Sequence, residues 1–468
     1  MPDKSDALSF SSLGLNRELL QVVAELGYTH ATPVQAASIP ALLSGRDLVG
    51  QSKTGSGKTV AFTLPILQSL NLQTKKVQAL ILCPTRELCT QVTREIRKLG
   101  RRHAGLNVVT LVGGQPGKPQ AMSLRQGPHI AVGTPGRVLD HLQRGALDLS
   151  SLAILVLDEA DRMLDMGFQE EMEAILSEAP PARQTAFFSA TFPESIEGMS
   201  AAYQKDPAHV KIAEDDSAKP AITERLYEVA EEDKLNALLG VLASSEAESA
   251  IVFCNLKATV ADLADALAEA GVSAAGLHGD LVQEARDKVM AKFRNASLRV
   301  LVATDVAARG IDVAGLDLVV NFDFPKPDTY VHRIGRTGRA GKEGLAASFL
   351  LPSEKYKLKG LAEALGRELT PEPLPMAEGP LEVKAERAQA AMVTFYIGGG
   401  RKEKVRPGDI LGALTGDAAG LAGTDVGKIE IHDHFAYVAV AAAVAPAALS
   451  RLRDGKIKGR KFRVELVD

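Results

Sequence analysis

The chain has 468 residues, too many for one hydrophobic core, and a prior of about 150 residues per domain suggests roughly three domains. Apolar residues make up 46% of the chain and Trp is absent, a composition that describes a globular protein and excludes disorder throughout. The net charge of −4 argues against binding to nucleic acid through bulk electrostatics, but residues 391–468 hold 12 Lys and Arg against 9 Asp and Glu, so the basic module is C-terminal.

Two further features concern the environment of the protein. The first six residues lack an apolar signal segment, and the apolar stretch 436–449 is too short to span a membrane, so we expect a cytoplasmic protein. The cysteines, Cys83, Cys89 and Cys254, form an odd count without metal-ligand spacing, so we expect core thiols.

Between residues 47 and 211, short apolar segments alternate with amphipathic stretches that are typical of helices. The predicted strands are Asp47–Gly50, Ala79–Cys83, Val108–Val112, Ile130–Val132, Ala153–Leu157 and Thr185–Phe188. This alternation predicts βαβ units and a parallel sheet, which places ligands at the carboxyl ends of its strands.

A glycine-rich segment, SKTGSGKT at residues 52–59, joins the first predicted strand to a helix that begins near Lys58. Its glycines let backbone amides approach phosphate oxygens, Lys58 supplies a positive charge, and Thr59 offers a hydroxyl to Mg²⁺. Ser52 stands where the usual pattern has glycine, so the segment taken alone is also compatible with a simple turn.

The acidic run Asp158-Glu159-Ala160-Asp161 directly follows a predicted buried strand. Two carboxylates at that strand end suit a hydrated magnesium ion and an attacking water. Alone, the run is also typical of a solvated turn or a helix start. Together with the phosphate loop, it predicts binding and hydrolysis of a nucleoside triphosphate.

The α/β rhythm breaks at residues 214–220 and then restarts, and a proline-rich spacer, TPEPLP at 370–375, precedes the last segment. The predicted strands of the second domain are Ala250–Phe253, Arg299–Ala303 and Leu316–Asn321. The last segment reads βαββαβ, over Met392–Ile397, Pro407–Leu414, Val426–Ile431, Phe435–Val440, Ala445–Arg453 and Arg460–Val467. We therefore expect domains at 1–210, 221–368 and 391–468, with linkers at 211–220 and 369–390.

Seven further motifs follow in a fixed order along the chain. They are TPVQ at 32–35, PTREL at 84–88, GG at 113–114, TPGR at 134–137, SAT at 189–191, ATDVAARGID at 303–312 and HRIGRTGR at 332–339. With the phosphate loop and the acidic run, this set resembles the DEAD-box RNA helicases from about residue 10 to residue 360. The resemblance implies two tandem RecA-like parallel-sheet domains in an α/β fold and an RNA-stimulated ATPase that uses ATP and Mg²⁺.

The resemblance also implies roles for single residues. ATP would be bound by Tyr28, Thr32, Gln35, Thr54, Gly55, Ser56, Gly57, Lys58, Thr59 and Asp305. Catalysis would use Lys58, Asp158, Glu159, Arg336 and Arg339, with Mg²⁺ on Thr59 and Asp158, partly through water. Glu159 would prepare the attacking water, and the two arginines would stabilise the transition state, so hydrolysis should require closure of the two domains. Asp161, Ser189, Thr191 and His332 would couple the nucleotide to that closure.

RNA contacts are implied in both α/β domains, and they would read the RNA backbone and not its sequence. These residues are Thr85, Arg86, Gly114, Thr134, Arg137, Arg286, Thr304 and Gly310. Ser52 stands where the family usually has alanine, and we expect that Ser52→Ala leaves the ATPase rate without a great change.

The βαββαβ segment resembles an RNA-recognition motif (RRM), an α+β fold that stacks bases on aromatic residues of its central strands. The candidate RNA-binding residues are Tyr396, Phe435 and Tyr437, flanked by the basic residues Arg401, Lys402, Lys404, Lys456, Lys458, Arg460 and Lys461. Core packing of the aromatic residues is the alternative. His432 and His434 are poor candidates for a metal site.

Including this tail, the whole chain resembles one bacterial branch of the family. That resemblance implies a hairpin of 23S ribosomal RNA and 50S assembly intermediates as partners. Two alternatives stay open, an ATP-gated RNA clamp or chaperone and a general RNA helicase without specificity for ribosomal RNA.

Overall fold

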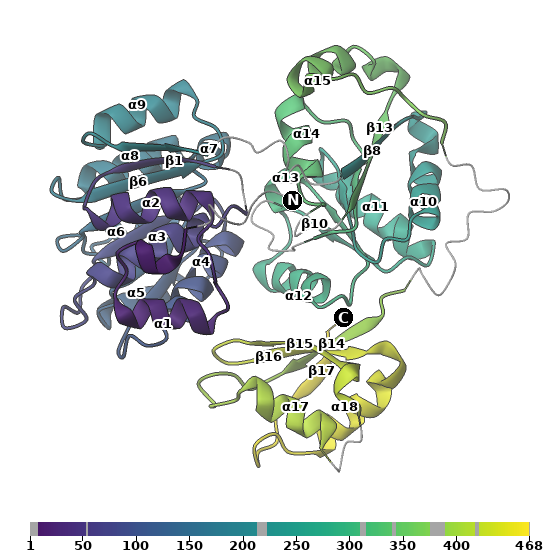
Figure 1. Ribbon diagram of the computed structural model, residues 1–468. Helices are drawn as coiled ribbons and strands as arrows, with labels where there is room; N and C mark the ends of the chain where they lie inside the picture. Colours follow the sequence, from purple (N-terminus) through teal and green to yellow (C-terminus); the bar gives the residue numbers. More distant parts are fainter. Residues whose placement is uncertain are drawn as a thin grey trace. The chain divides into compact units, whose positions relative to one another are not determined.

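A computed structural model describes residues 8–52, 55–212, 222–308, 315–338, 343–374, 389–416 and 421–467. The first domain contains a seven-stranded sheet with the order β3-β4-β2-β5-β6-β1-β7, and every neighbouring pair in it is parallel. Its strands are β1 Leu48–Gln51, β2 Ala79–Leu82, β3 Val108–Leu111, β4 Ile130–Gly133, β5 Ile154–Asp158, β6 Gln184–Ser189 and β7 Ala208–Lys211. Figure 1 shows β1 and β6 of this sheet with helices on both sides.

Helices cover both faces of this sheet because alternate residues of each strand point to opposite sides. Ile81 of β2 belongs to one buried apolar cluster, and its neighbours Leu80 and Leu82 belong to the other. The helices are α1 Arg17–Glu25, α2 Pro33–Leu43, α3 Lys58–Ser69, α4 Arg86–Leu99, α5 Gly117–Arg125, α6 Pro135–Gln143, α7 Ala160–Asp165, α8 Gln169–Glu178 and α9 Glu194–Tyr203.

The second domain contains a six-stranded parallel sheet with the order β10-β11-β9-β12-β13-β8. Its strands are β8 Ile222–Glu228, β9 Ala250–Phe253, β10 Ala274–Leu277, β11 Val300–Ala303, β12 Leu318–Asn321 and β13 Gly344–Leu350. Its helices are α10 Lys234–Ser244, α11 Lys257–Glu269, α12 Gln283–Arg294, α13 Asp305–Ala308, α14 Pro327–Ile334 and α15 Lys357–Leu365. Strands β8, β10 and β13 were not predicted from the sequence.

The C-terminal domain has a four-stranded antiparallel sheet with the order β15-β16-β14-β17. Its elements are β14 Met392–Ile397, α17 Pro407–Thr415, β15 Val426–Ile431, β16 Ala436–Ala441, α18 Ala445–Asp454 and β17 Val464–Leu466. Both helices pack on one sheet face, where Phe395 and Val438 are fully buried. The expected βαββαβ order is confirmed.

The last strand is shorter than predicted, because a turn occupies the start of the expected range Arg460–Val467. Ile457 and Arg460 pair with each other across this turn, which contains Gly459 at φ 77°. The strand proper begins only at Val464.

The start of the expected spacer lies along the edge of the second sheet. Glu372 pairs with Tyr227 of β8, and the backbone N–H of Glu372 donates to the carbonyl of Leu226 at 2.7 Å. Leu374 packs against the core cluster that lies beneath this edge. Among the described residues, no helix is both long enough and apolar enough to cross a bilayer.

Candidate nucleotide and RNA sites

The phosphate loop lies between β1 and α3 and is closely packed against Gln35. Gly57 immediately precedes α3 with φ 97°, and a Cβ atom placed on it would lie 2.4 Å from Nε2 of Gln35. This amide donates to the carbonyl of Gly57 at 3.2 Å, while Oε1 of Gln35 accepts from the backbone of Thr32 at 3.0 Å. Only glycine allows so close an approach in this left-handed conformation. The glutamine and the loop, 22 residues apart, thus form one site.

Three further members of the proposed ATP set, Lys58, Thr59 and Tyr28, lie in the first domain. Lys58 is the buried first residue of α3, and Thr59 is half-buried beside it. The phenol of Tyr28 donates to Glu95 at 2.9 Å and accepts from Lys98 at 3.0 Å, so α4 fixes the orientation of its ring.

Asp158 and Glu159 lie at the carboxyl end of β5, as predicted, and both are buried. Glu159 adopts a left-handed conformation, with φ 56°, in which a non-glycine residue is strained. This turn ends the strand and starts α7 at the next residue. Burial raises the pKa of Asp158 to about 7, against the opposing effect of the positive charge of Lys58.

The carboxylate oxygens at this strand end fit a hydrated divalent cation. Oδ1 of Asp158 and Oε2 of Glu159 are buried without a hydrogen-bond partner among the described residues. Nε of Arg162 approaches Oε2 of Glu159 at 3.5 Å as an ion pair. Magnesium prefers such oxygen ligands and keeps several of its waters, so the donor set suits this ion.

Asp161 joins the acidic run to the Ser-Ala-Thr segment after β6. Its Oδ2 accepts hydrogen bonds from the backbone of Thr191 at 2.9 Å and from the hydroxyl of Thr191 at 2.9 Å. Its own backbone N–H donates to Oγ of Ser189 at 3.2 Å. Burial disfavours the charged carboxylate, but the hydrogen bonds from Thr191 and Ser189 outweigh that effect and lower the pKa of Asp161. Three of the four proposed coupling residues therefore form a single network.

In the second domain, Asp305 is bound by Arg333, an arginine that was not among the predicted site residues. The guanidinium of Arg333 donates to both carboxylate oxygens of Asp305, at 2.8 and 2.7 Å, and to Oδ1 of Asn255 at 2.9 Å. The side chain of Arg333 is 1% exposed. Arg333 lies within the motif HRIGRTGR, between His332 and Arg336, so this motif could have indicated it as a functional residue. His332 is half-buried on α14, and Arg336 is buried just after it.

The proposed RNA residues of the first domain gather where β2, β3 and β4 end. The guanidinium of Arg86 covers Gly114 so closely that a Cβ atom there would lie 1.9 Å from Nη1. Arg137 donates to the carbonyl of Gln115 at 3.0 Å. The remaining two, Thr85 and Thr134, are buried residues that immediately precede α4 and α6.

Two proposed RNA residues of the second domain are described. Thr304 follows β11, and its hydroxyl accepts a long hydrogen bond of 3.4 Å from the backbone of Ala307. Arg286 lies in the first half of α12 and points toward the carbonyl of His278. Thr54, Gly310 and Arg339 lie outside the described residues.

The aromatic residues of the C-terminal sheet form a cluster on the face away from α17 and α18. Tyr396 and Phe435 stack with ring centroids 5.5 Å apart, and His432 stacks on Phe435 at 4.4 Å. Tyr437 is only 5% exposed and packs with Ala291 of α12. This packing leaves Tyr437 little surface for a base, whereas Tyr396 and Phe435 are half-buried.

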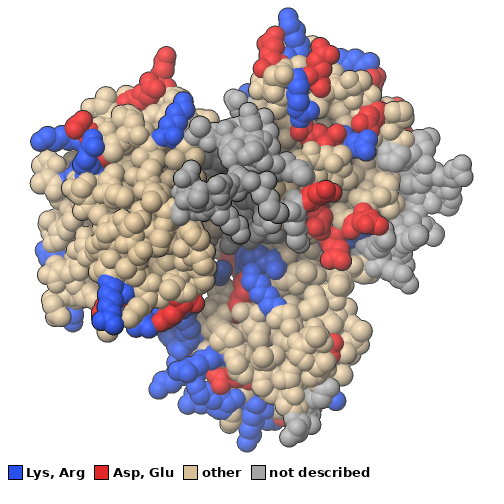
Figure 2. Space-filling model, viewed as in Figure 1, with Lys and Arg blue, Asp and Glu red and all other residues tan. Residues whose placement is uncertain are grey.

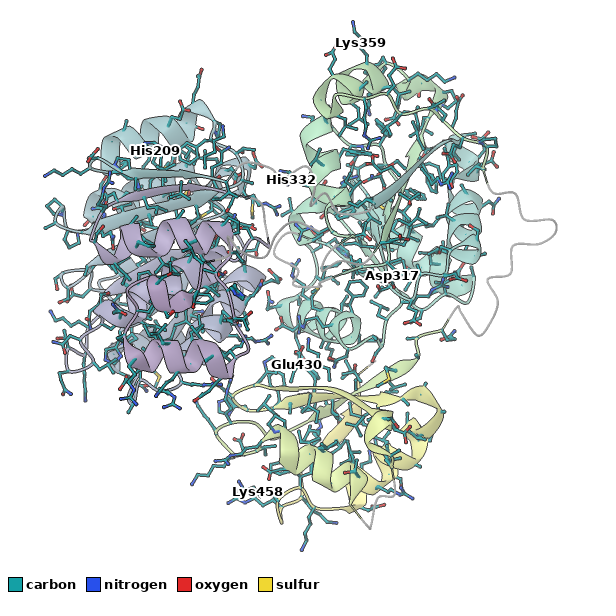
Figure 3. All side chains as sticks on the ribbon, viewed as in Figure 1. His209, Asp317, His332, Lys359, Glu430 and Lys458 are labelled. Atoms are coloured by element: carbon teal, nitrogen blue, oxygen red, sulfur yellow. The ribbon has the colours of Figure 1, made fainter. Side chains whose placement is uncertain are left out.

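The basic residues of the tail lie in two neighbouring turns, residues 401–406 and 456–461, which we call the basic loops. All seven proposed basic RNA-binding residues in these loops are exposed, and Figure 2 shows Lys and Arg gathered on this domain. Nζ of Lys458 donates to the carbonyl of Lys404 at 2.9 Å, which joins the loops. In Figure 3, Lys458 and Glu430 lie on opposite sides of the C-terminal domain.

A second group of residues, for which no sequence pattern indicated a contact, connects the C-terminal sheet to α12 and the residues just after it. Arg294 forms two hydrogen bonds to the carboxylate of Glu430, both 3.1 Å long. Oγ of Ser297 lies 2.7 Å from Oγ1 of Thr394. Arg294 and Glu430 are 136 positions apart, so neither helical nor strand periodicity could have paired them.

The fold and the sites together define a nucleotide-hydrolysing enzyme with two RecA-like domains and an appended RNA-binding domain. A DEAD/DEAH box helicase family model matches residues 32–199, a helicase conserved C-terminal domain model matches 233–341, and a DbpA RNA binding domain model matches 394–466. The chain is 49% identical over 444 residues to the ATP-dependent RNA helicase DbpA of Escherichia coli K12, with 95% of this chain and 96% of that protein covered.

Two other relatives support the same family. The DbpA of Bacillus subtilis 168 is 38% identical over 473 residues, with 97% of this chain and 98% of that protein covered. The structure of Saccharomyces cerevisiae Dbp5 bound to RNA and ADP BeF3 superposes with a TM-score of 0.71 at 32% identity, over 79% of this chain and 96% of that one. The chain belongs to the DEAD-box ATP-dependent RNA helicases, in their DbpA branch.

Proposed function

We propose that the enzyme opens short RNA duplexes and that its C-terminal domain directs it to a hairpin of 23S ribosomal RNA during assembly of the 50S subunit. The observation that carries this proposal is the pair of exposed basic loops, joined through Lys458 and Lys404, in a domain that matches the DbpA RNA binding domain. Exposed lysines and arginines bind phosphates and release counterions, which supplies affinity for RNA.

Within the ATP site, we assign roles from the geometry of the first domain. Lys58 contacts the outer phosphates, and Glu159 orients or deprotonates the attacking water at the end of β5. Mg²⁺ on Asp158 and Thr59 would neutralise part of the phosphate charge. Arg336 and Arg339 belong to the second domain, so hydrolysis requires that domain to deliver them to the nucleotide.

A bound C-terminal domain acts as a tether for the two RecA-like domains. It raises the effective concentration of the neighbouring duplex without any new contact between the duplex and the catalytic residues. Preference for one ribosomal hairpin would therefore come from the tail, whereas the RecA-like domains read only the RNA backbone.

The test is the ATPase rate of the full chain with a 23S rRNA hairpin near the peptidyl-transferase centre, compared with a shuffled hairpin of equal length. We expect strong stimulation by the ribosomal hairpin only. The variant with Lys456, Lys458 and Lys461 changed to Ala should lose this preference. A variant with Lys355, Lys357 and Lys359 changed to Ala controls for the loss of three charges. Equal stimulation by both hairpins would instead support a general helicase.

Glu159→Gln distinguishes the helicase from the clamp alternative, because it should block hydrolysis and leave nucleotide binding in place. A helicase loses duplex unwinding and its cellular role in this variant. Retention of that role with hydrolysis blocked would favour the clamp.

A further inference from the structure

Ser52 contacts three parts of the ATP site through three different polar groups. Its backbone N–H donates to the carbonyl of Ser189 at 3.0 Å, and its carbonyl accepts from Nζ of Lys58 at 3.0 Å. Its hydroxyl lies 3.0 Å from the hydroxyl of Ser56. With 5% of its surface exposed, Ser52 makes all three contacts away from bulk solvent.

Only one of these contacts depends on the serine side chain. An alanine at position 52 would keep both backbone hydrogen bonds, so Lys58 and Ser189 would still be held. The contact between the two hydroxyls would be lost. This contact joins the residue that follows β1 to the residue that precedes Gly57.

We propose that Ser52 is a positioning residue that holds Ser56, and with it Gly57 and Lys58 at the start of α3, in place for the nucleotide. Residues 56–58, held in place before phosphates bind, lose less conformational freedom on binding, so the serine pair strengthens nucleotide binding. The gain applies equally to the ground state and to the transition state, because neither hydroxyl takes part in the attack on the γ-phosphate. Such uniform binding changes KM and leaves kcat unchanged. The inference rests on ATP hydrolysis, which family membership supplies, and not on the ribosomal target.

The test compares the wild type with Ser52→Ala in the full chain. We measure Kd for ATP and ADP, and KM and kcat for ATP under saturating RNA. Loss of one buried hydrogen bond is worth about 1 kcal/mol, so Kd for both nucleotides and KM should rise about fivefold. The value of kcat should stay within about twofold of wild type. Unchanged or tighter nucleotide binding, or a fall in kcat at constant KM, overturns the proposal.

A double-mutant cycle separates the loop contact from general damage. Ser56→Ala should weaken nucleotide binding in the wild-type background and have a much smaller effect when Ser52 is already alanine. Equal effects in both backgrounds would contradict the proposed contact. The matched control is Ser69→Ala at the far end of α3, where the hydroxyl bonds the carbonyl of Ile66 and no change in Kd is expected.

Discussion

Asp158 shows how a single buried carboxylate combines a structural cost with a functional position. Its buried Oδ1 has no hydrogen-bond partner among the described residues, and its ordinary pKa of 3.8 is raised to about 7 chiefly by burial. The Asp158 carboxyl group therefore binds its proton more tightly in the folded chain than in the unfolded chain. The stability that this preference contributes is present at acidic pH and is lost as pH rises from about 4 to about 7.

Asp158→Asn removes the charge and should stabilise the nucleotide-free enzyme, more so at high pH. Between pH 5 and pH 8 the stability difference between variant and wild type should grow by about 2 kcal/mol, or about 5 °C in Tm. Thermal unfolding of both proteins, followed by circular dichroism at each pH, measures this difference in Tm. Asp165→Asn at the exposed end of α7 controls for the loss of one charge. A difference in Tm that does not vary with pH would show that Asp158 is not the titrating group.

Lys404 is a second residue at which conformation points to function. It adopts φ 62°, a left-handed conformation that costs a non-glycine residue about 1 kcal/mol or more, and Lys458 adopts φ 51° in the neighbouring basic loop. Glycine would relieve this strain, yet both positions carry exposed lysines.

We expect Lys404→Gly to raise Tm and, under the proposed function, to weaken binding of the ribosomal hairpin. The glycine relieves the strain at position 404. The loss of one phosphate contact should reduce the slope of log K for RNA binding against log salt concentration by about one. Lys402→Gly in the same loop removes a charge without relieving left-handed strain, so it should lower both Tm and the affinity for the hairpin. Unchanged affinity for RNA after Lys404→Gly would remove this residue from the RNA site.

At the scale of elements, helix α12 and the sheet of the C-terminal domain form a polar and aromatic contact. Glu430 of β15 is 6% exposed at its side chain and is surrounded by Arg294, Lys428 and His432. Burial disfavours its charge, but interactions with His432, Arg294 and Lys428 hold its pKa well below the usual range. A buried acid with this many partners is stable only while those partners stay in place.

Arg294→Ala should therefore release the C-terminal domain from α12. Removal of one partner of a buried ion pair costs about 2 kcal/mol or more, and Lys428 and His432 supply only part of the lost compensation. Small-angle scattering should show a larger radius of gyration for the variant. Lys288→Ala, an exposed residue of the same helix, should leave the radius unchanged. If Arg294→Ala also leaves it unchanged, the contact does not hold the domain.

At the scale of the whole molecule, most of the fold was accessible from local patterns. The strands β1 to β6 were predicted within about two residues because each is a short apolar segment, buried on both faces, that ends at a turn. Strand β10 was missed because Ala274-Ala275-Gly276-Leu277 has small side chains and no β-branched residue, and such a segment has no strand signal.

The chemistry of this protein could be predicted from local sequence, because the phosphate loop, the acidic strand end and the ordered motifs are short segments whose function depends on residues close together in the chain. Only the folded chain shows which distant residues meet, namely Arg333 with Asp305 and Arg294 with Glu430. The packing of Tyr437 against α12 is likewise visible only in the fold. Such contacts arise from packing between elements far apart in the chain, and no periodicity within one element encodes them.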